Sequence, residues 1–306
     1  MPLERAVAHT GRSDNLWSAR VRYFNSGNAF ALNLSRVPSV QFVDERDRAF
    51  DADAPTGLID MDLSEALETP YPATTPLILS RYARIRAGET LDIDVRASAQ
   101  LYCVLTGRGT TRIDDETVHW HAGDVLALPG AARTEHRADE TAVAWLVTDE
   151  PALSFFDLAP VDAPASVIQP VHYHAEDLRT ELDRVYQHPD ADTFPGYAVV
   201  LSHARLEHTR NIHPTMTLAL NSLPAGRSQR PHVHSAMALT LCLQGEGVYS
   251  LVDGERKDWH RHAVMVTPPG APHAHCNEGD ARMESLVIQD GGLHYYTRTT
   301  GFAFVD

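Results

Sequence analysis

The stretch that decides the fold is RPHVHSAMALTLCLQGEG, residues 230–247. It begins with two histidines, His232 and His234, and continues as an apolar run that ends at a Gly-x-Gly turn. On a β-strand, residues i and i+2 point to the same face, so the two imidazoles would project side by side. An isolated pair of this kind is more often two surface histidines. Two neutral imidazoles so placed can also chelate one divalent metal, which raises the hypothesis of a metal site at the start of a buried strand.

An internal repeat extends outward from this stretch. Residues 86–109 align with residues 224–247 without a gap, and three glycines coincide. One inserted residue later, Trp120 falls on Trp259. The repeat unit of about 140 residues is too long for a solenoid and has the size of a duplicated domain.

Each half contains short β-rich runs that are closed by glycine-containing turns, such as LYCVLTG in the first half and ALTLCLQG in the second. Many short, evenly spaced strands predict an all-β fold with an antiparallel sandwich or barrel in each half. We therefore predict domains at 1–160 and 161–306, with a Pro- and Ala-rich linker over 157–170. The spacing of apolar residues predicts a helix over 174–186, and a second short helix is expected near residue 62.

Composition excludes several classes of function. The formal net charge of −15 would repel phosphate backbones, so we expect no nucleic-acid partner. No stretch approaches the roughly 20 apolar residues of a membrane span, and the first residues lack the apolar region of a signal peptide. The three cysteines lack the spacing of a disulfide framework or a zinc knuckle, so a reducing cytoplasm is the expected location.

A third histidine, His273, follows a Pro-Pro-Gly turn in PPGAPHAHCN, residues 268–277. Gly226, the His-x-His pair and Gly245 have the spacing of the first cupin motif, and Pro268 to Asn277 have that of the second. The chain thus resembles the cupin superfamily, and because the resemblance covers both halves, it resembles a bicupin. The resemblance implies two small antiparallel jelly-roll barrels, with a metal held inside by His232, His234 and His273.

Two departures from the family pattern carry information. The usual glutamate ligand after the histidine pair is replaced by Ala238, which leaves three neutral ligands and about three open positions in an octahedral site. In the first half, Asp94, Arg96 and Thr134 stand at the histidine positions. A guanidinium cannot act as a ligand, so we expect the N-terminal cupin to be metal-free.

Among bicupins with three histidine ligands, the chain resembles the gentisate-type ring-cleaving dioxygenases, in HVHSAMALTLCLQGEGVYSLVDGER, in PHAHCN and in HPTMTLALNSLPAG. This resemblance implies Fe(II)-dependent insertion of both atoms of O2 into a hydroxylated aromatic acid or phenol, without an external reductant. Three imidazoles also suit manganese, nickel, copper and zinc. The expected partners are an aromatic small molecule and O2, and we expect a homo-oligomer, either a dimer or a tetramer.

The residues that would contact the substrate are less marked. His275, two residues after His273, is a candidate catalytic donor that would orient a ligand or bound oxygen, although it could also lie on the outer face of its strand. Relatives that cleave salicylate-like acids often carry an arginine where this chain has Thr240. A substrate carboxylate would then need another cation, and the candidates are Arg205, Arg230 and Arg282.

Two other classes of function fit the same motifs. One is a non-oxidative cupin metalloenzyme, such as an isomerase, a decarboxylase or a C–C bond-cleaving enzyme, in which the metal acts only as a Lewis acid. The other is a small-molecule-binding cupin with a vestigial site. Cupins host many chemistries, so the fold alone does not choose among these.

Overall fold

The computed structural model describes residues 9–11, 13–30, 32, 34–162, 165–191, 194 and 196–305. The chain divides into an N-terminal arm, residues 1–36, and a body, residues 37–306. Among its described residues, the arm contains an antiparallel pair of two-residue strands and one short helix: β1 (His9–Thr10), α1 (Leu16–Ala19) and β2 (Arg22–Tyr23). Among the helices in the described residues, none is both long and apolar enough to cross a bilayer.

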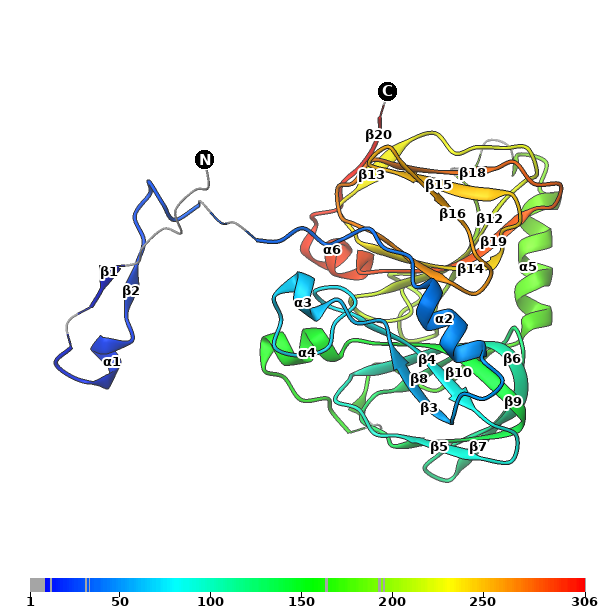
Figure 1. The fold of residues 1–306 in the computed structure, drawn as a ribbon, viewed down its shortest axis with the longest axis horizontal. Helices are drawn as coiled ribbons and strands as arrows, with labels where there is room; N and C mark the ends of the chain where they lie inside the picture. Colours follow the sequence, from blue (N-terminus) through cyan, green and yellow to red (C-terminus); the bar gives the residue numbers. More distant parts are fainter. Residues whose placement is uncertain are drawn as a thin grey trace. The chain divides into compact units, whose positions relative to one another are not determined.

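The first half of the body is an eight-stranded antiparallel sheet that curls into a barrel (Figure 1). Its main path runs β10-β8-β6-β9-β4-β3, with β5 added to β9 and β7 added to β6. Register shifts where β6 pairs with β9 let these two long strands bend around the barrel. The strands are β3 (Gly57–Asp60), β4 (Leu79–Ile85), β5 (Thr90–Ile93), β6 (Ala99–Ile113), β7 (Glu116–His121), β8 (Val125–Pro129), β9 (Thr134–Thr148) and β10 (Val171–Tyr173).

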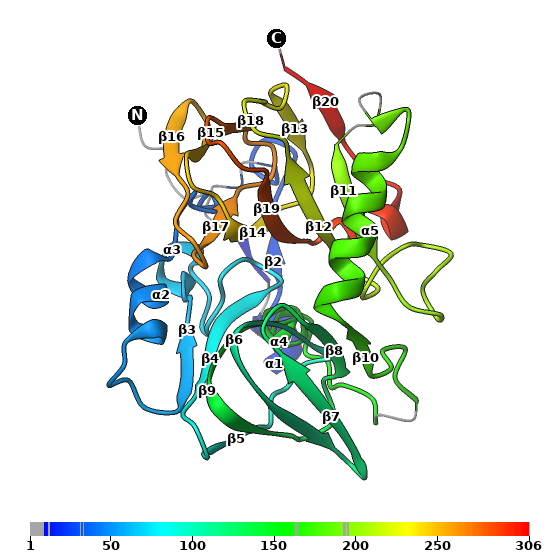
Figure 2. The ribbon, with the colours of Figure 1, turned by 90° about the vertical axis from the view of Figure 1, so that its right-hand side faces the viewer.

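The second half of the body is a barrel made of two five-stranded sheets (Figure 2). One sheet has the order β11-β12-β19-β14-β17, and the other has the order β16-β15-β18-β13-β20. The strands are β11 (Tyr197–Leu201), β12 (Thr217–Leu223), β13 (His232–His234), β14 (Ala238–Gln244), β15 (Val248–Val252), β16 (Glu255–Asp258), β17 (Val264–Thr267), β18 (His273–Asn277), β19 (Met283–Gln289) and β20 (Phe302–Phe304).

The helices of the body are few and lie outside the barrels. They are α2 (Val43–Phe50), α3 (Ser64–Leu67), α4 (Glu150–Phe156), α5 (Ala175–Gln187) and α6 (Gly291–Thr297). The helix predicted over 174–186 is confirmed as α5, and it buries Leu178 and Leu182 as its apolar spacing requires. The short helix expected near residue 62 is confirmed as α3.

The two barrels share one apolar core. Side chains alternate across each strand, so one face of β6 and β14 points away from its own barrel. On β14 these residues are Leu239 and Leu241, which join a cluster that also contains Leu101 and Trp145 of the first barrel. The shared core fixes the barrels to one another, and the opposite face of each strand is left to form the barrel interior.

The predicted fold class, all-β with two tandem jelly-roll barrels and a few short helices, is confirmed by this architecture. The boundary at residue 160 stays a prediction. Strand β10 lies after that residue and still pairs with β8 of the first barrel, and β11 is the first strand of the second barrel.

Candidate metal centre

Three histidines from two neighbouring strands meet at one end of the second barrel. His232 and His234 form the ends of β13, and His273 begins β18, where it pairs directly with His232. The ring centroid of His273 lies 4.3 Å from that of His232 and 4.6 Å from that of His234. One nitrogen from each ring lies within 4.8 Å of the other two. This spacing fits three ligands about 2.1 Å from one ion after small rotations of the rings.

Backbone carbonyls select the nitrogen that each ring offers. The Nδ1 atoms of His232, His234 and His273 lie 3.0, 2.6 and 2.9 Å from the carbonyl oxygens of Arg230, Ala236 and Ala271. A carbonyl can only accept, so each Nδ1 carries the hydrogen and each Nε2 keeps its lone pair. Among the described residues, no hydrogen bond to these three Nε2 atoms is present. The donor set therefore fits a divalent metal.

Burial favours the neutral form of two of these rings, His234 and His273. It lowers the pKa of His234, and it lowers the pKa of His273 to about 4, with the neighbouring imidazoles adding to the effect. Neutral imidazole is the form that binds a metal, so the lowered pKa values of His234 and His273 favour the ligand state.

The interior of the second barrel is polar and partly open. On β12, Leu218 and Leu220 are buried in the shared core, whereas Thr217, Ala219 and Asn221 on the opposite face keep some solvent access. Only one end of this interior is filled by an apolar cluster, whose members are Leu223, Cys242, Val248, Trp259 and Met283.

The interior of the first barrel is filled instead. Twelve buried apolar residues pack there, and the remaining cavity, lined in part by Tyr102 and His136, holds about 20 Å³. That volume has room for about one water. The two barrels thus differ: His232, His234 and His275 of the second barrel keep some solvent access, whereas Tyr102 and His136 of the first barrel are buried.

Comparison of corresponding strands identifies the residues that fill the interior of the first barrel and their replacements in the second. Tyr102 lies between β8 and β9, and Thr240 lies between β17 and β19, which are the corresponding strands. Two residues earlier, Gln100 corresponds to Ala238 in the same way. The phenol and the amide that plug the first barrel are therefore replaced by a hydroxyl and a methyl group in the second.

Thr240, a predicted substrate-contacting residue, faces the barrel interior. Its neighbours Leu239 and Leu241 point into the shared core, so Thr240 and Cys242 point the other way, and Cys242 packs against Trp259. Thr240 is 3 % exposed, and among the described residues its hydroxyl has no hydrogen-bond partner.

His275, the predicted catalytic donor, also faces the interior. Its ring lies 6.0 Å from that of His273 and 5.5 Å from the indole of Trp259, between centroids. Its Nδ1 lies 2.7 Å from the hydroxyl of Ser250, which accepts a hydrogen bond from Trp259 Nε1 at 2.8 Å. Burial, with the three nearby imidazoles, lowers the pKa of His275 to about 3, so it is a neutral group.

The three predicted arginines lie in different places. Arg230 adjoins the histidines, and its guanidinium lies 4.6 Å from the ring centroid of Phe304 on β20. Arg205 donates to the carbonyl of Ser166, in the connection between the barrels. Among the three, only Arg230 is next to the candidate metal centre.

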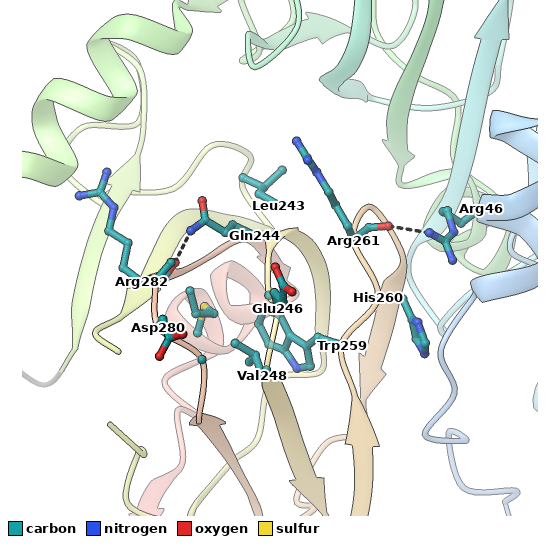
Figure 3. Close-up of a pocket in the computed structure, with 15 residues that line it drawn as sticks. Arg46, Leu243, Gln244, Glu246, Val248, Trp259, His260, Arg261, Asp280 and Arg282 are labelled. Carbon is teal, nitrogen blue, oxygen red and sulfur yellow. Dashed lines mark hydrogen bonds between the residues drawn. The ribbon is translucent and has the colours of Figure 1, made fainter. Parts of the chain in front are cut away.

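Arg282 occupies a separate surface pocket beyond the far end of β18 (Figure 3). The pocket has a volume of about 680 Å³, and none of the three candidate ligands lines it. Arg282 donates to Asp183 and to Glu284 at 2.6 Å each, so its charge is already matched. The prediction that Arg282 reaches a substrate at the histidines therefore has no support in its position.

The residue of the first barrel that corresponds to His232 was predicted to be Asp94, and the structure shows that it is the residue before it. Ile93, one residue before Asp94, is the counterpart of His232, because each lies opposite the first residue of the strand after the Pro-Gly turn. Asp94 and Arg96 are exposed, whereas Ile93 is 2 % exposed in the filled interior. An apolar residue at this position favours a metal-free first barrel, which stays a prediction.

A second group with metal-binding side chains lies on the first barrel, at Asp124, His172 and His174. Its carboxylate already accepts hydrogen bonds from His172 Nε2 and from the backbone N–H groups of His121 and Ala175, all within 3.0 Å. Asp124 therefore ties β8 to β10 and to the first residue of α5, which is a structural role.

Sequence reasoning missed Ser250, Trp259 and the pairing of β20 with β13. The repeat carried a signal for the first two, because Thr111, Trp120 and His136 precede Ser250, Trp259 and His275 by the same 139 positions. No sequence signal marked β20, whose Phe302 lies 5.4 Å from the His232 ring between centroids.

Comparison with known proteins agrees with this geometry. The Cupin domain family matches residues 219–289, which include all four interior histidines. The chain is 25% identical over 142 residues to a gentisate 1,2-dioxygenase of Ralstonia sp., covering 45% of this chain and 39% of that protein. It is 32% identical over 81 residues to a 5-aminosalicylate 1,2-dioxygenase of Comamonas sp., covering 26% and 22%. The chain thus matches less than half the length of these curated relatives.

Among solved structures, the salicylate 1,2-dioxygenase of Pseudaminobacter salicylatoxidans has a TM-score of 0.71 at 14% identity, covering 89% of this chain and 90% of that one. The same enzyme with gentisate has a TM-score of 0.71 at 13% identity, covering 89% and 86%. At this identity the likeness shows the fold. The chain has two tandem barrels of the fold seen in these structures, and its sequence is similar to the Cupin domain family over residues 219–289 and to gentisate-type ring-cleaving dioxygenases.

Proposed function

We propose that this bicupin is a non-haem Fe(II) dioxygenase that cleaves the ring of a hydroxylated aromatic acid or phenol, using O2 without an external reductant. The observation that carries the proposal is the triad itself. Among the described residues, His232, His234 and His273 each have Nδ1 bound to a carbonyl and Nε2 without a protein partner, beside inward-facing residues that keep some solvent access. The curated relatives act on gentisate and 5-aminosalicylate, which supports this substrate class.

In this proposal the three histidines hold the metal, and Ala238 leaves the ligand set without a carboxylate. Bound iron would supply open positions for substrate and O2 and a path for electrons between them. Because the protein ligands are neutral, an anionic substrate would balance the charge of the ion. Manganese, nickel, copper and zinc would also fit three imidazoles.

The chain's other residues have separate roles. Thr240 and Ala238 leave the space for the ring, since Tyr102 and Gln100 fill the same space in the first barrel. His275 offers a hydrogen bond to an oxygen of the bound molecule. The first barrel would bind no metal and would support the second through the shared core. The cytoplasmic location and the homo-oligomeric state expected from the sequence remain part of this proposal.

The test is a substrate screen with protein that is loaded anaerobically with Fe(II). Gentisate, salicylate, 5-aminosalicylate and matched phenols would be compared by O2 uptake and by loss of the aromatic absorbance. We expect one O2 consumed per ring cleaved, with no need for NADH or 2-oxoglutarate. Full turnover under strict anaerobiosis would reject the dioxygenase and favour a Lewis-acid enzyme, and tight binding without turnover would favour a binding protein.

A further inference from the structure

A buried relay of hydrogen bonds ends at His275. The indole of Trp259 can only donate, and it donates to Ser250 Oγ at 2.8 Å. The Ser250 hydroxyl has one hydrogen, and its other partner is His275 Nδ1 at 2.7 Å. Ser250 is fully buried, and if it accepted from both groups its own hydrogen would have no partner among the described residues. The arrangement that pairs this hydrogen has Ser250 donating to Nδ1, which places the hydrogen of the neutral imidazole on Nε2.

The first barrel contains the same relay. Trp120 Nε1 donates to Thr111 Oγ1 at 2.9 Å, and Thr111 Oγ1 lies 2.7 Å from His136 Nδ1. Thr111 pairs with His136 across β6 and β9, as Ser250 pairs with His275 across β15 and β18. The arrangement is therefore a feature that both barrels keep, with threonine and serine as interchangeable hydroxyls.

The first barrel also shows what the Nε2 hydrogen does. His136 Nε2 lies 3.1 Å from the Tyr102 hydroxyl and 3.0 Å from Thr134 Oγ1. Both hydroxyls give their own hydrogens to Gln100 Oε1, at 2.5 and 3.1 Å. They must accept from His136, so its Nε2–H is the donor and both of its acceptors belong to the protein.

In the second barrel these acceptors have been removed. Thr240, His273 and Ala238 stand where Tyr102, Thr134 and Gln100 stand in the first barrel. Among the described residues, His275 Nε2 has no hydrogen-bond partner. The relay thus leaves His275 Nε2–H as a donor that has no acceptor among the described residues.

We propose that Ser250 and Trp259 are positioning residues that hold His275 with its hydrogen on Nε2, so that the open barrel presents one fixed neutral donor to an oxygen atom of the bound molecule. The location of that molecule rests on the proposed function. The relay selects a ligand whose oxygen can accept at this point, such as a phenolate, a carbonyl or a carboxylate. A ligand without such an oxygen leaves a buried donor unpaired and should bind more weakly.

The experiment combines tautomer and kinetic readouts on four variants. Long-range 1H–15N correlation spectra of histidine-labelled, metal-free protein report which nitrogen of His275 carries the hydrogen. Ser250→Ala and Trp259→Phe each remove one donor of the relay. Ser250→Thr keeps a hydroxyl and substitutes the residue that the first barrel uses. Thr111→Ala removes the corresponding hydroxyl from the first barrel. Thermal unfolding measures the structural cost of each change.

We expect His275 to be the Nε2–H tautomer in the wild type and in Ser250→Thr, and a mixture in Ser250→Ala. Relative to the wild type, kcat/KM should fall about tenfold or more in Ser250→Ala, with metal content unchanged, and stay within about twofold in Ser250→Thr. Thr111→Ala should lower the melting temperature but leave kcat/KM unchanged. An unchanged tautomer in Ser250→Ala, or a loss in Ser250→Thr as large as in Ser250→Ala, would overturn the proposal. The tautomer measurement needs no turnover, so it tests the relay independently of the dioxygenase assignment.

Discussion

His232 lies directly opposite His273 across the β13–β18 pair, with 4.3 Å between ring centroids. This pairing joins the two sequence motifs into one site, because His234 then lies on the same face two residues along β13. The turn before β18 is also bonded to β13, because the backbone N–H of Gly270 donates to the carbonyl of His234 at 2.9 Å. The triad is therefore held by the sheet itself.

One metal ion per chain is the first expectation. His232→Ala should remove nearly all bound metal, because two imidazoles alone hold an ion weakly at this open site. Arg96→Ala changes an exposed residue three positions after β5, the equivalent strand of the first barrel, and should leave the metal content unchanged. Elemental analysis after anaerobic loading measures both variants, and a value near two equivalents per wild-type chain would show that the first barrel also binds.

A tyrosine at position 240 should close the open barrel. Thr240→Tyr would place a phenol where Tyr102 fills the first barrel, so it should compete with the substrate for space while leaving the three ligands in place. We expect metal content close to that of the wild type and binding of phenolic acids weakened by about tenfold or more. Thr240→Ser keeps the space and the hydroxyl and serves as the control. Undiminished binding in Thr240→Tyr would place the substrate elsewhere.

Acid should destabilise the protein through buried histidines, and His136 offers the cleanest case. Burial lowers the pKa of His136 to about 4, whereas an unfolded histidine titrates near 6.5. Below pH 6.5 the unfolded chain takes up a proton that the folded chain does not, so stability falls as the pH drops from 6.5 towards 4 and is constant above that range. For one such group the loss between pH 7 and pH 5 is about 2 kcal/mol.

Urea unfolding of the metal-free protein at pH 7 and pH 5 measures this effect. His136→Gln should be less stable than the wild type at pH 7, because it breaks the network with Thr111 and Tyr102. Its further loss on going to pH 5 should be smaller than the wild-type loss by about 2 kcal/mol. Equal losses in the two proteins would mean that His136 does not titrate differently on folding.

Much of the fold and the triad could be predicted because both depend on local periodicity. The His-x-His pair and the apolar alternation of β14 follow from a strand period of two, and the repeat predicts the second barrel from the first. Asp94 was wrongly aligned with His232 because the single-residue gap between the two halves can be placed before or after this segment. The pairing of Ile93 with Thr134 shows that Ile93 is the counterpart of His232.

The surroundings of the site could not be predicted to the same degree, because they depend on contacts between distant segments. The partner that neutralises Arg282 is Asp183 on α5, which no spacing rule connects to it. The strand that covers His232 is β20, formed by the last residues described. The relay of Trp259 and Ser250 was present in the repeat, but its meaning required the hydrogen-bond geometry.

Recognition of a substrate carboxylate should depend on Arg230. Thr240 offers only a short neutral hydroxyl where a guanidinium would normally pair with the carboxylate, and Arg282 and Arg205 are held elsewhere. Arg230 adjoins the triad through its carbonyl, which accepts from His232 Nδ1, and its guanidinium lies over Phe304. We therefore expect Arg230→Ala to raise KM about tenfold for gentisate or salicylate and much less for phenols without a carboxylate.

Arg282→Ala is the matched control for this prediction. It removes an equal charge from the far pocket, so it should lower stability through the lost contacts with Asp183 and Glu284 and leave the ratio of the two KM values unchanged. Steady-state kinetics on paired substrates that differ only in the carboxylate decide the matter. If gentisate is the best substrate and its KM is unaltered in Arg230→Ala, the carboxylate is bound by other groups, and the argument from Thr240 is wrong.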